Sequence, residues 1–503
     1  MDELTENIDS KINLLELNNA TLYDLPSHIN VPNYDRSKLN AGIVHIGVGN
    51  FHRAHLSWYI HRLLERGMAN NWSIIGGSVR KQDSKMRDKL LSQDFLTTLI
   101  ELDPNGDNHA EIVGAMIDYV PIDEDNKSLI QIMANPQIKI VSMTITEGGY
   151  YQDPISKKLD STHPDIIHDS QNPDTPRTVF GAIIAALKIR RQNGYGPFTG
   201  LCCDNLQENG TVLHASILGL ATLSNPELAE WIDANCSFPN SMVDCIVPAT
   251  GAAEKELVRS IGVNDAVPVT HENFRQWVIE DNFCAGRPDL ELVGATFSDK
   301  VYQYETQKIR ILNGGHQILA NTAEILGLST IYDAMANPLI RQFFSKVEQE
   351  EILPNVSDLP DLSTLDYLQL ISSRFANKSV MDTVRRVSFD GSSRHPGFIL
   401  PSIYDNLRNG GLLNGLALVE AAWARMCEGT REDGTIIEAN DPDWSHLHEH
   451  AKAARHNPKK WLEMEHIYGN LINEDSFAPA FERWLKSIYE NGIEQTIRLY
   501  LDE

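Results

Sequence analysis

The stretch from Tyr304 to His316 concentrates side chains that could move protons. Its apolar residues recur at helical spacing, which predicts a helix. At about 100° per residue, Glu305, Lys308, Asn313 and His316 fall within an arc of about 140°. A carboxylate, an amine, an amide and an imidazole would then face the same place, which is suitable for acid–base chemistry. The simpler alternative is a surface helix with a lysine and a histidine on its wet side.

The same stretch contains the pair Gly314-Gly315. Inside a helix, each glycine costs about 1 kcal/mol relative to alanine. We therefore expect the backbone there to lie close to another group, such as a ligand.

Length and composition set the broad class. A chain of 503 residues is long for one core and predicts two domains. Hydrophobic residues make up 42% and charged residues 22%, as in ordinary globular proteins. A net charge of -26 disfavours nucleic acid and anionic membranes as partners. No apolar run approaches the roughly 20 residues that a membrane span needs.

The cysteines and the N-terminus favour the cytoplasm. The six cysteines form no CxxC pair and no zinc-ligand spacing, so we expect reduced thiols. The first residues, Met1 to Glu6, are acidic and lack the apolar core of a secretory signal. The sequence therefore predicts a cytoplasmic protein.

A nucleotide-binding turn is predicted near the N-terminus. Residues 43–48 read as a buried parallel strand, and a helix follows from Leu56. Between them stands Gly47-x-Gly49, with His52 where a third glycine is usual. A strand, a glycine turn and a helix provide the context of a dinucleotide fingerprint.

A second strand, residues 72–79, leads to Arg80 and Asp83. At this place an acidic side chain binds the ribose hydroxyls of NAD, whereas an arginine could favour NADP. We therefore predict NAD, with NADP possible. A solvated turn is the alternative reading of both residues.

Four histidines surround the turn, namely His45, His52, His55 and His61. They lack carboxylate or cysteine partners at ligand spacing, so we interpret them as structural. No metal is predicted.

Two more strands end in candidate binding residues. Residues 138–146 form a strand that ends at Thr146 and Glu147, which we predict to contact the nucleotide. After a helix at 176–193, the strand 198–203 ends just before Asn205, whose amide could reach a substrate oxygen or cap a helix.

Beyond about residue 297 the strand signal stops, and helices are predicted at 300–326, 337–350, 363–375, 411–428, 444–455 and 475–492. The predicted fold class is α/β: a Rossmann-type domain with an extended mixed sheet (1–296), then a mainly α-helical domain (297–503). The Lys308 stretch would lie at the seam, a favoured place for active sites. In the second half of the chain, Arg386 and Arg394 could bind hydroxyls or an anion, although their spacing favours structural ion pairs.

Taken together, these segments resemble the long-chain polyol dehydrogenases, the mannitol 2-dehydrogenase family, over nearly the whole chain. The matching motifs occur in the expected order: Gly47-Val48-Gly49-Asn50-Phe51-His52-Arg53-Ala54-His55, Cys203-Asp204-Asn205, Pro239-Asn240-Ser241-Met242-Val243-Asp244, Lys308-x4-Asn313-x2-His316 and Asp390-Gly391-Ser392-Ser393-Arg394.

The resemblance assigns roles to these residues. It implies that Lys308 is the general acid/base, with Asn205 and Asn313 stabilising the oxyanion and His316 orienting a substrate hydroxyl. Glu305 would match the proton-relay carboxylate. The polyol site would comprise Asp244, Arg386 and Arg394, and the nucleotide loop would include Gly47, Gly49, Asn50 and Phe51.

The sequence departs from the family pattern at three positions. Cys245 stands where the family signature has arginine, Arg394 where many members have lysine, and Gln82 where NAD-preferring members carry a second acid.

The expected chemistry is the oxidation of a secondary alcohol without a metal. A free lysine, with a pKa of about 10.4, is protonated at neutral pH. Burial beside a nicotinamide cation would lower that pKa, and two neutral amides could stabilise an alkoxide.

Mannitol and fructose are the leading substrate pair. The alternatives are a fructuronate or tagaturonate reductase, an arabinitol or sorbitol dehydrogenase, and a non-catalytic redox sensor. The expected partners are a small polyol or ketose and no nucleic acid or membrane, in a monomer or small homo-oligomer.

Overall fold

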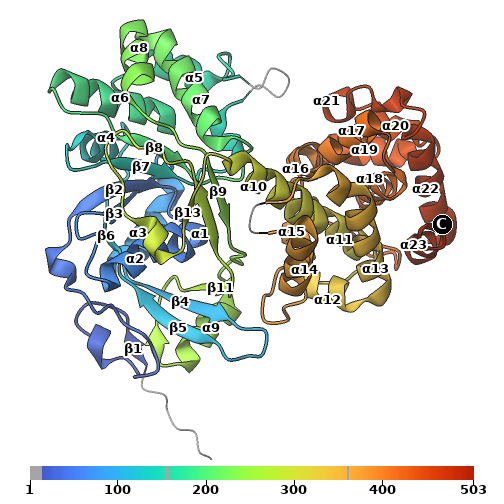
Figure 1. The fold of residues 1–503 in the computed structure, drawn as a ribbon, viewed down its shortest axis with the longest axis horizontal. Coiled ribbons are helices and arrows are strands. Elements are labelled where there is room, and N and C mark those ends of the chain that lie inside the picture. The colour runs from blue at the N-terminus through green and yellow to red at the C-terminus, as the bar shows by residue number, and fades with distance from the viewer. Residues whose placement is uncertain (1–13, 153–157, 360–361) are drawn as a thin grey trace, which may run out of the picture. The chain divides into compact units, whose positions relative to one another are not determined.

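The computed structural model describes residues 14–152, 158–359 and 362–503, and the chain divides into two compact units between Val301 and Tyr302 (Figure 1). The first unit combines strands and helices, and the second is built mainly from helices. This confirms the predicted fold class. Among the described residues, no helix has both the length and the apolar character that crossing a bilayer requires.

The centre of the first unit is a five-stranded parallel sheet with strand order β6-β3-β2-β7-β8. Its strands are β2 (Ala41–Ile46), β3 (Ser73–Gly77), β6 (Met116–Tyr119), β7 (Ile140–Met143) and β8 (Thr199–Cys202). The order reverses beside β2, as in Rossmann folds, where ligands bind beyond the carboxyl ends of the strands. Three of these strands, β3, β7 and β8, lie within the predicted ranges, and β2 overlaps its predicted range but begins two residues earlier.

Two hydrophobic clusters cover this sheet. One contains residues of β2, β7 and β8 together with α4 (Lys127–Ala134), α6 (Val179–Gln192), α7 (Asn209–Ser224) and α8 (Pro226–Asn235). The other includes α2 (Leu56–Glu65). The remaining helices of this unit are α1 (Asn50–Ala54), α3 (Ser84–Leu91), α5 (Pro164–Gln171) and α9 (Ala252–Ser260).

The mixed β-structure is divided among further sheets instead of extending the central one. One has the order β11-β4-β5, formed by β11 (Val269–Glu272), β4 (Thr97–Leu102) and β5 (His109–Val113). Another has the order β13-β12-β9, formed by β13 (Thr296–Phe297), β12 (Gln276–Ile279) and β9 (Ser241–Asp244). Each contains a parallel and an antiparallel pair. A short parallel pair joins β1 (Leu15–Glu16) to β10 (Val263–Asn264).

The second unit is organised around α11 (Gly314–Ile325), in which every residue is buried. Before it come α10 (Val301–Gln307) and a π-helical segment, Lys308–Asn313. The helices after it are α12 (Ile331–Ala336), α13 (Pro338–Val347), a second π-helical segment (Glu348–Ile352), α14 (Thr364–Phe375), α15 (Val384–Val387), α16 (Gly391–Phe398), α17 (Leu400–Asn409), α18 (Asn414–Met426), α19 (Trp444–Ala454), α20 (Lys459–Leu462), α21 (Glu465–Tyr468), α22 (Ala478–Asn491) and α23 (Ile493–Leu501). Each of the six predicted helical ranges contains at least one of these helices.

The paired glycines at the start of α11 allow close packing within the protein. A Cβ atom on Gly315 would lie 2.7 Å from Phe344 Cε2 and 3.0 Å from Glu348 Oε1. On Gly314 the nearest neighbour would be the carbonyl oxygen of Phe398, at 3.4 Å. The close neighbours that the sequence predicts at Gly315 are therefore side chains of α13 and of the second π-helical segment.

We expect Gly315→Ala to destabilise the protein by about 1–3 kcal/mol, because the added methyl group must displace a buried ring. Gly397→Ala in α16 is the matched control, since a Cβ there meets nothing within 4 Å. That control should be neutral or gain about 0.5–1 kcal/mol. Urea unfolding of both variants measures the difference, and equal stabilities would contradict the packing argument.

Candidate active site

The predicted nucleotide turn follows β2 and depends on its glycines. Gly47 has φ +92°, and a Cβ atom there would lie 2.1 Å from the carbonyl oxygen of Thr144. A Cβ atom on Gly49 would meet nothing within 4 Å, so open space lies beside the turn. Gly47 is thus required by the backbone, whereas Gly49 leaves room for a group to approach the start of α1.

Asn50 and Phe51 follow the turn and already have protein contacts. The Asn50 amide nitrogen donates to the Pro248 carbonyl at 3.1 Å and to Thr250 Oγ1 at 2.9 Å. The Phe51 ring stacks on His55, with 4.8 Å between the ring centroids. These contacts fix the start of α1.

Asp83 lies just beyond β3, as predicted for a ribose-binding acid. Its Oδ2 accepts a hydrogen bond from Ser78 Oγ at 2.6 Å and faces Arg80 Nε at 3.4 Å. The carboxylate is therefore held beside the carboxyl end of the strand, with Arg80 as a weak, exposed ion-pair partner.

Asp204, which the sequence analysis did not single out, organises the turn after β7. Its carboxylate accepts from the backbone N–H groups of Ile145 at 3.0 Å and Thr146 at 2.9 Å, and from the Tyr150 hydroxyl at 2.7 Å. Burial raises the pKa of Tyr150 well above its usual value. Thr146 has φ +65° and ψ 162°, a strained conformation for a β-branched residue. One carboxylate thus holds a strained turn at the predicted nucleotide edge.

Three further predicted residues lie near the ends of strands in the same unit. Asn205 directly follows Asp204 and is exposed. Asp244 is the last residue of β9 and is buried, opposite Gln276 in the β12 ladder. Glu147 begins the turn after Thr146, but its side chain lies outside the described structure.

The histidines near the turn are buried, mostly with protein partners. His45 contacts Ser142 Oγ and Thr144 Oγ1, His55 contacts the Gln276 carbonyl, and His61 contacts the Tyr34 hydroxyl. Burial lowers the pKa of His45 and of His61 to about 3. His52 differs: it stacks on His45 at 3.6 Å, and neither of its ring nitrogens has a hydrogen-bond partner among the described residues.

The geometry of this unit fits a dinucleotide. Gly49 leaves open space beyond β2, Asp83 stands beyond β3, and the Thr146 turn stands beyond β7. Because β2 pairs with both β3 and β7, these three positions share one edge of the sheet.

In the second unit, a π-helical segment carries two predicted catalytic residues, one at each end. Lys308 is its first residue and Asn313 its last. A π-helix joins residues five apart, as the bond from the Gly314 N–H to the Ile309 carbonyl shows. Lys308 and Asn313 are also five apart, so they lie one π-turn from each other. The helix that the sequence predicts is present, but over these residues it is a π-helix instead of an α-helix with about 100° per residue.

Several polar groups of this π-helical turn and of the residues just before it are buried. Glu305 and Lys308 are both buried. The Asn313 Oδ1 atom is buried and has no hydrogen-bond partner among the described residues. An isolated buried acceptor is costly, and π-turns occur often at functional sites.

His316 lies beside an ion pair. Its Nε2 is 3.7 Å from Asp382 Oδ2, and its ring stacks on Phe375 at 4.2 Å. Asp382 also accepts two hydrogen bonds from Arg386, each of 2.7 Å. Burial lowers the pKa of His316 to about 3, an effect that Asp382 opposes. The imidazole is therefore neutral near pH 7 and can donate and accept one hydrogen bond each.

Arg386 thus has the structural ion pair that its spacing favours. Asp382, four residues earlier, is the partner that the sequence analysis missed. Arg394 Nη1 donates to the carbonyl of Val387 and to that of Arg386, the latter at 3.2 Å. The two arginines and His316 accordingly belong to one polar group.

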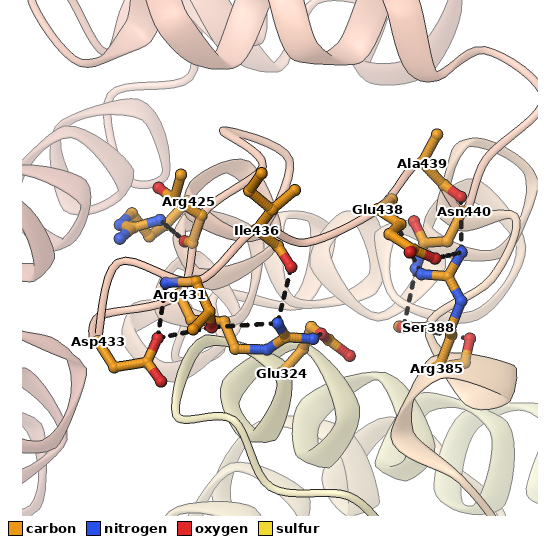
Figure 2. A network of polar contacts seen from close by, with 12 residues as sticks. Glu324, Arg385, Ser388, Arg425, Arg431, Asp433, Ile436, Glu438, Ala439 and Asn440 are labelled. Atoms are coloured by element: carbon orange, nitrogen blue, oxygen red, sulfur yellow. Dashed lines mark hydrogen bonds and ion pairs between the residues drawn. The ribbon is translucent and has the colours of Figure 1, made fainter.

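A loop between α18 and α19 anchors the segment that carries these arginines (Figure 2). Arg431 in this loop pairs with Glu324 of α11. Asn440 Nδ2 donates to Ser388 Oγ at 3.0 Å, and Arg385 Nη2 donates to the Ala439 carbonyl at 2.8 Å. The loop therefore fastens α15 and the start of α16 in place.

The predicted site residues fall into two groups. Asn205 and Asp244 belong to the first unit, and Glu305, Lys308, Asn313, His316, Arg386 and Arg394 to the second. A Rossmann-type sheet with a nucleotide turn and a separate helical unit bearing acid–base groups defines a dinucleotide-dependent oxidoreductase.

Comparison with known proteins places the chain within this class. Residues 41–292 match the mannitol dehydrogenase Rossmann domain, and residues 300–489 match the mannitol dehydrogenase C-terminal domain. The chain belongs to the mannitol dehydrogenase family. Membership confirms the predicted class, an NAD-dependent polyol oxidoreductase.

The similar proteins match over almost their full lengths. The mannitol 2-dehydrogenase of Cereibacter sphaeroides is 50% identical over 470 residues, covering 93% of this chain and 98% of that protein. A mannitol 2-dehydrogenase of Aspergillus fumigatus is 38% identical over 500 residues, covering 97% and 99%.

Two solved structures are also similar. The ternary complex of Pseudomonas fluorescens mannitol 2-dehydrogenase with NAD and D-mannitol has a TM-score of 0.92 at 38% identity, covering 97% of this chain and 100% of that chain. A substrate-free D-sorbitol dehydrogenase has a TM-score of 0.84 at 32% identity, covering 96% and 100%.

A further buried acid, Glu348, lies next to the start of α11, which follows the Lys308 turn. Glu348 begins the second π-helical segment, and its carboxyl group lies against Gly315. Neither of its oxygens has a hydrogen-bond partner among the described residues. Burial raises the pKa of Glu348 well above its usual value, which favours the uncharged acid in the folded protein. No local sequence signal identifies it.

The burial of Glu348 predicts that the free energy of unfolding depends on pH through this group, and Glu348→Gln should remove that contribution. The unfolded chain releases the Glu348 proton above a pH of about 4.3, whereas the folded protein holds it to a higher pH. The native state is therefore destabilised by this group as the pH rises, by about 1.4 kcal/mol per pH unit until the folded pKa is reached. We expect the stability of Glu348→Gln relative to the parent to increase between about pH 5 and pH 7.

Urea unfolding at both pH values measures this difference. Glu350→Gln is the control, because Glu350 is exposed in the same π-helical segment. A stability difference that does not change with pH for Glu348→Gln would show that the acid ionises in the folded protein.

Proposed function

We propose that the protein interconverts D-mannitol and its 2-ketose, fructose, with NAD as the hydride acceptor. The observation that carries this proposal is the π-helical segment that begins with the buried Lys308 and ends with Asn313. The supporting comparisons are the full-length similarity to mannitol 2-dehydrogenases and to the complex with NAD and D-mannitol. Together they favour a polyol as the substrate.

In the proposed mechanism, Lys308 moves the proton of the reacting hydroxyl. During oxidation the ε-amine accepts this proton as hydride leaves the carbon, and during reduction the ammonium returns it. When bound, NAD would supply the nicotinamide ring as the hydride acceptor. The Asn205 and Asn313 amides donate hydrogen bonds to the alkoxide oxygen.

The remaining residues position the substrate and export the proton. The neutral His316 orients a hydroxyl next to the reacting carbon. Asp244, Arg386 and Arg394 bind the other hydroxyls of the polyol. Glu305, three residues before Lys308 and buried with it, passes the proton towards water.

Arg386 bears on the choice among related substrates. Its guanidinium is already paired with Asp382 through two hydrogen bonds, so its charge is largely satisfied. This favours hydroxyl binding over the binding of a substrate carboxylate, and hence a polyol over a hexuronate. The similarity to a D-sorbitol dehydrogenase makes sorbitol the second candidate.

A panel of substrates tests the proposal. The pure protein is incubated with NAD and mannitol, sorbitol or arabinitol, and with NADH and fructose, fructuronate or tagaturonate. We expect the highest kcat/KM with mannitol and fructose. If a hexuronate is turned over faster than fructose, the protein is a hexuronate reductase and the proposed substrate is wrong. If no substrate is turned over with NAD or NADH, the non-catalytic redox sensor is the remaining alternative.

Lys308→Ala tests the role of the amine. Because general acid–base catalysis contributes about 10²–10⁴-fold, kcat should fall by about that factor while NADH binding persists. A small added amine should restore part of the rate. Lys300→Ala, an exposed lysine on the same part of the chain, is the control and should keep full activity. Unchanged kcat in Lys308→Ala would contradict the mechanism.

Asp83→Ala tests the nucleotide preference. A carboxylate accepts from the ribose hydroxyls and repels a 2′-phosphate, so its loss should raise the relative use of NADP about tenfold or more. Asp88→Ala in α3 is the exposed control. The measurement is the ratio of kcat/KM with the two nucleotides, and an unchanged ratio would place the discriminating residue elsewhere.

A further inference from the structure

A group of metal-ligand side chains lies at the start of α19, and none of them has a role in the reaction. Asp443 immediately precedes the helix, His446 lies in its first turn, and His466 comes from α21. Asp443 Oδ2 is 3.1 Å from His446 Nδ1 and 3.8 Å from His466 Nε2. One candidate ligand atom from each residue lies within 4.8 Å of the other two. We propose that these three residues bind a divalent first-row transition metal ion, with Zn²⁺ as the representative.

The donor set and its spacing suit such an ion. Two imidazoles and one carboxylate are ligands of Zn²⁺, whereas Mg²⁺ prefers oxygen ligands and bound water. With metal–ligand distances of about 2.0–2.1 Å, tetrahedral ligands stand about 3.3 Å apart. The two separations from Asp443 lie on either side of this value, and the histidine nitrogens lie within 4.8 Å of each other. Small side-chain rotations would therefore complete the site, with water as the fourth ligand.

The backbone that carries these ligands is firmly held. Leu447, next to His446, is fully buried, and Ile467 and Tyr468, which follow His466, are also buried. The Tyr468 hydroxyl donates to Glu420 at 2.6 Å. The ligands are thus attached to two anchored helices, so binding an ion would cost little ordering of the chain.

The structure also indicates what the ion would stabilise. The Asp443 N–H donates to Asp441 Oδ1 at 2.8 Å. The Asp441 carboxylate in turn accepts from the N–H and the hydroxyl of Ser392, at 2.8 and 2.7 Å. Ser392 lies in α16, two residues before Arg394. A bound ion would accordingly connect α21 to the start of α19. Through Asp441, the start of α19 is hydrogen-bonded to α16, so the proposed role of the ion is structural.

The test uses the untagged, full-length protein, treated with a chelator and then dialysed. Isothermal titration with Zn²⁺ in excess Mg²⁺ should show one saturable site, and Zn²⁺ should raise the Tm. Removing a partner that only supports a ligand weakens metal binding about 10–100-fold. We therefore expect His446→Ala and His466→Ala each to weaken Zn²⁺ binding by about 100-fold or more.

Two further variants make the test specific. Asp443→Asn keeps the shape of the ligand but removes its charge, so it should also weaken binding. His456→Ala, an exposed histidine just beyond α19, should bind Zn²⁺ like the parent. No saturable binding, or binding that persists in the doubly substituted His446→Ala, His466→Ala protein, would overturn the proposal.

Discussion

The burial of α11 on every side constrains the whole second unit. A helix without an exposed face must provide a partner within the protein for each polar side chain it carries. Gln317 donates to the Val387 carbonyl at 3.1 Å, Asn321 contacts His395 Nε2 at 2.9 Å, and Glu324 pairs with Arg431. These contacts reach α15, α16 and the loop before α19. The segments that carry the candidate arginines are therefore positioned by the polar residues of one buried helix.

Most elements of the fold could be predicted because they depend on local patterns. The β2 strand, its glycine turn and the helices of the second unit follow from the spacing of apolar residues along the chain. The π-turn at Lys308 could not be predicted in this way, because an inserted residue shifts the register without changing the composition. The division of the mixed β-structure into separate sheets depends on long-range pairing, such as that of β4 with β11, which periodicity does not reveal.

The site residues show the same distinction. Asp382 precedes Arg386 by four residues, a spacing from which the pair could have been inferred. Asp204 was quoted in a motif, but its hydrogen bonds to the turn after β7 join strands far apart in sequence. Glu348 is recognisable only when α13, α14 and α11 are seen packed together, because nothing in its neighbouring residues distinguishes it from the exposed Glu350.

The turn held by Asp204 has a consequence for ligand affinity. A loop that becomes ordered only when a ligand arrives loses conformational entropy at that moment, at a cost of about 1–2 kcal/mol per residue. The residues from Ile145 to Tyr150 are instead fixed in advance by three hydrogen bonds to one carboxylate, strain at Thr146 included. The entropy cost of ordering these residues is therefore incurred when the protein folds and not when a ligand binds. A dinucleotide that binds at this edge would not have its affinity reduced by that cost.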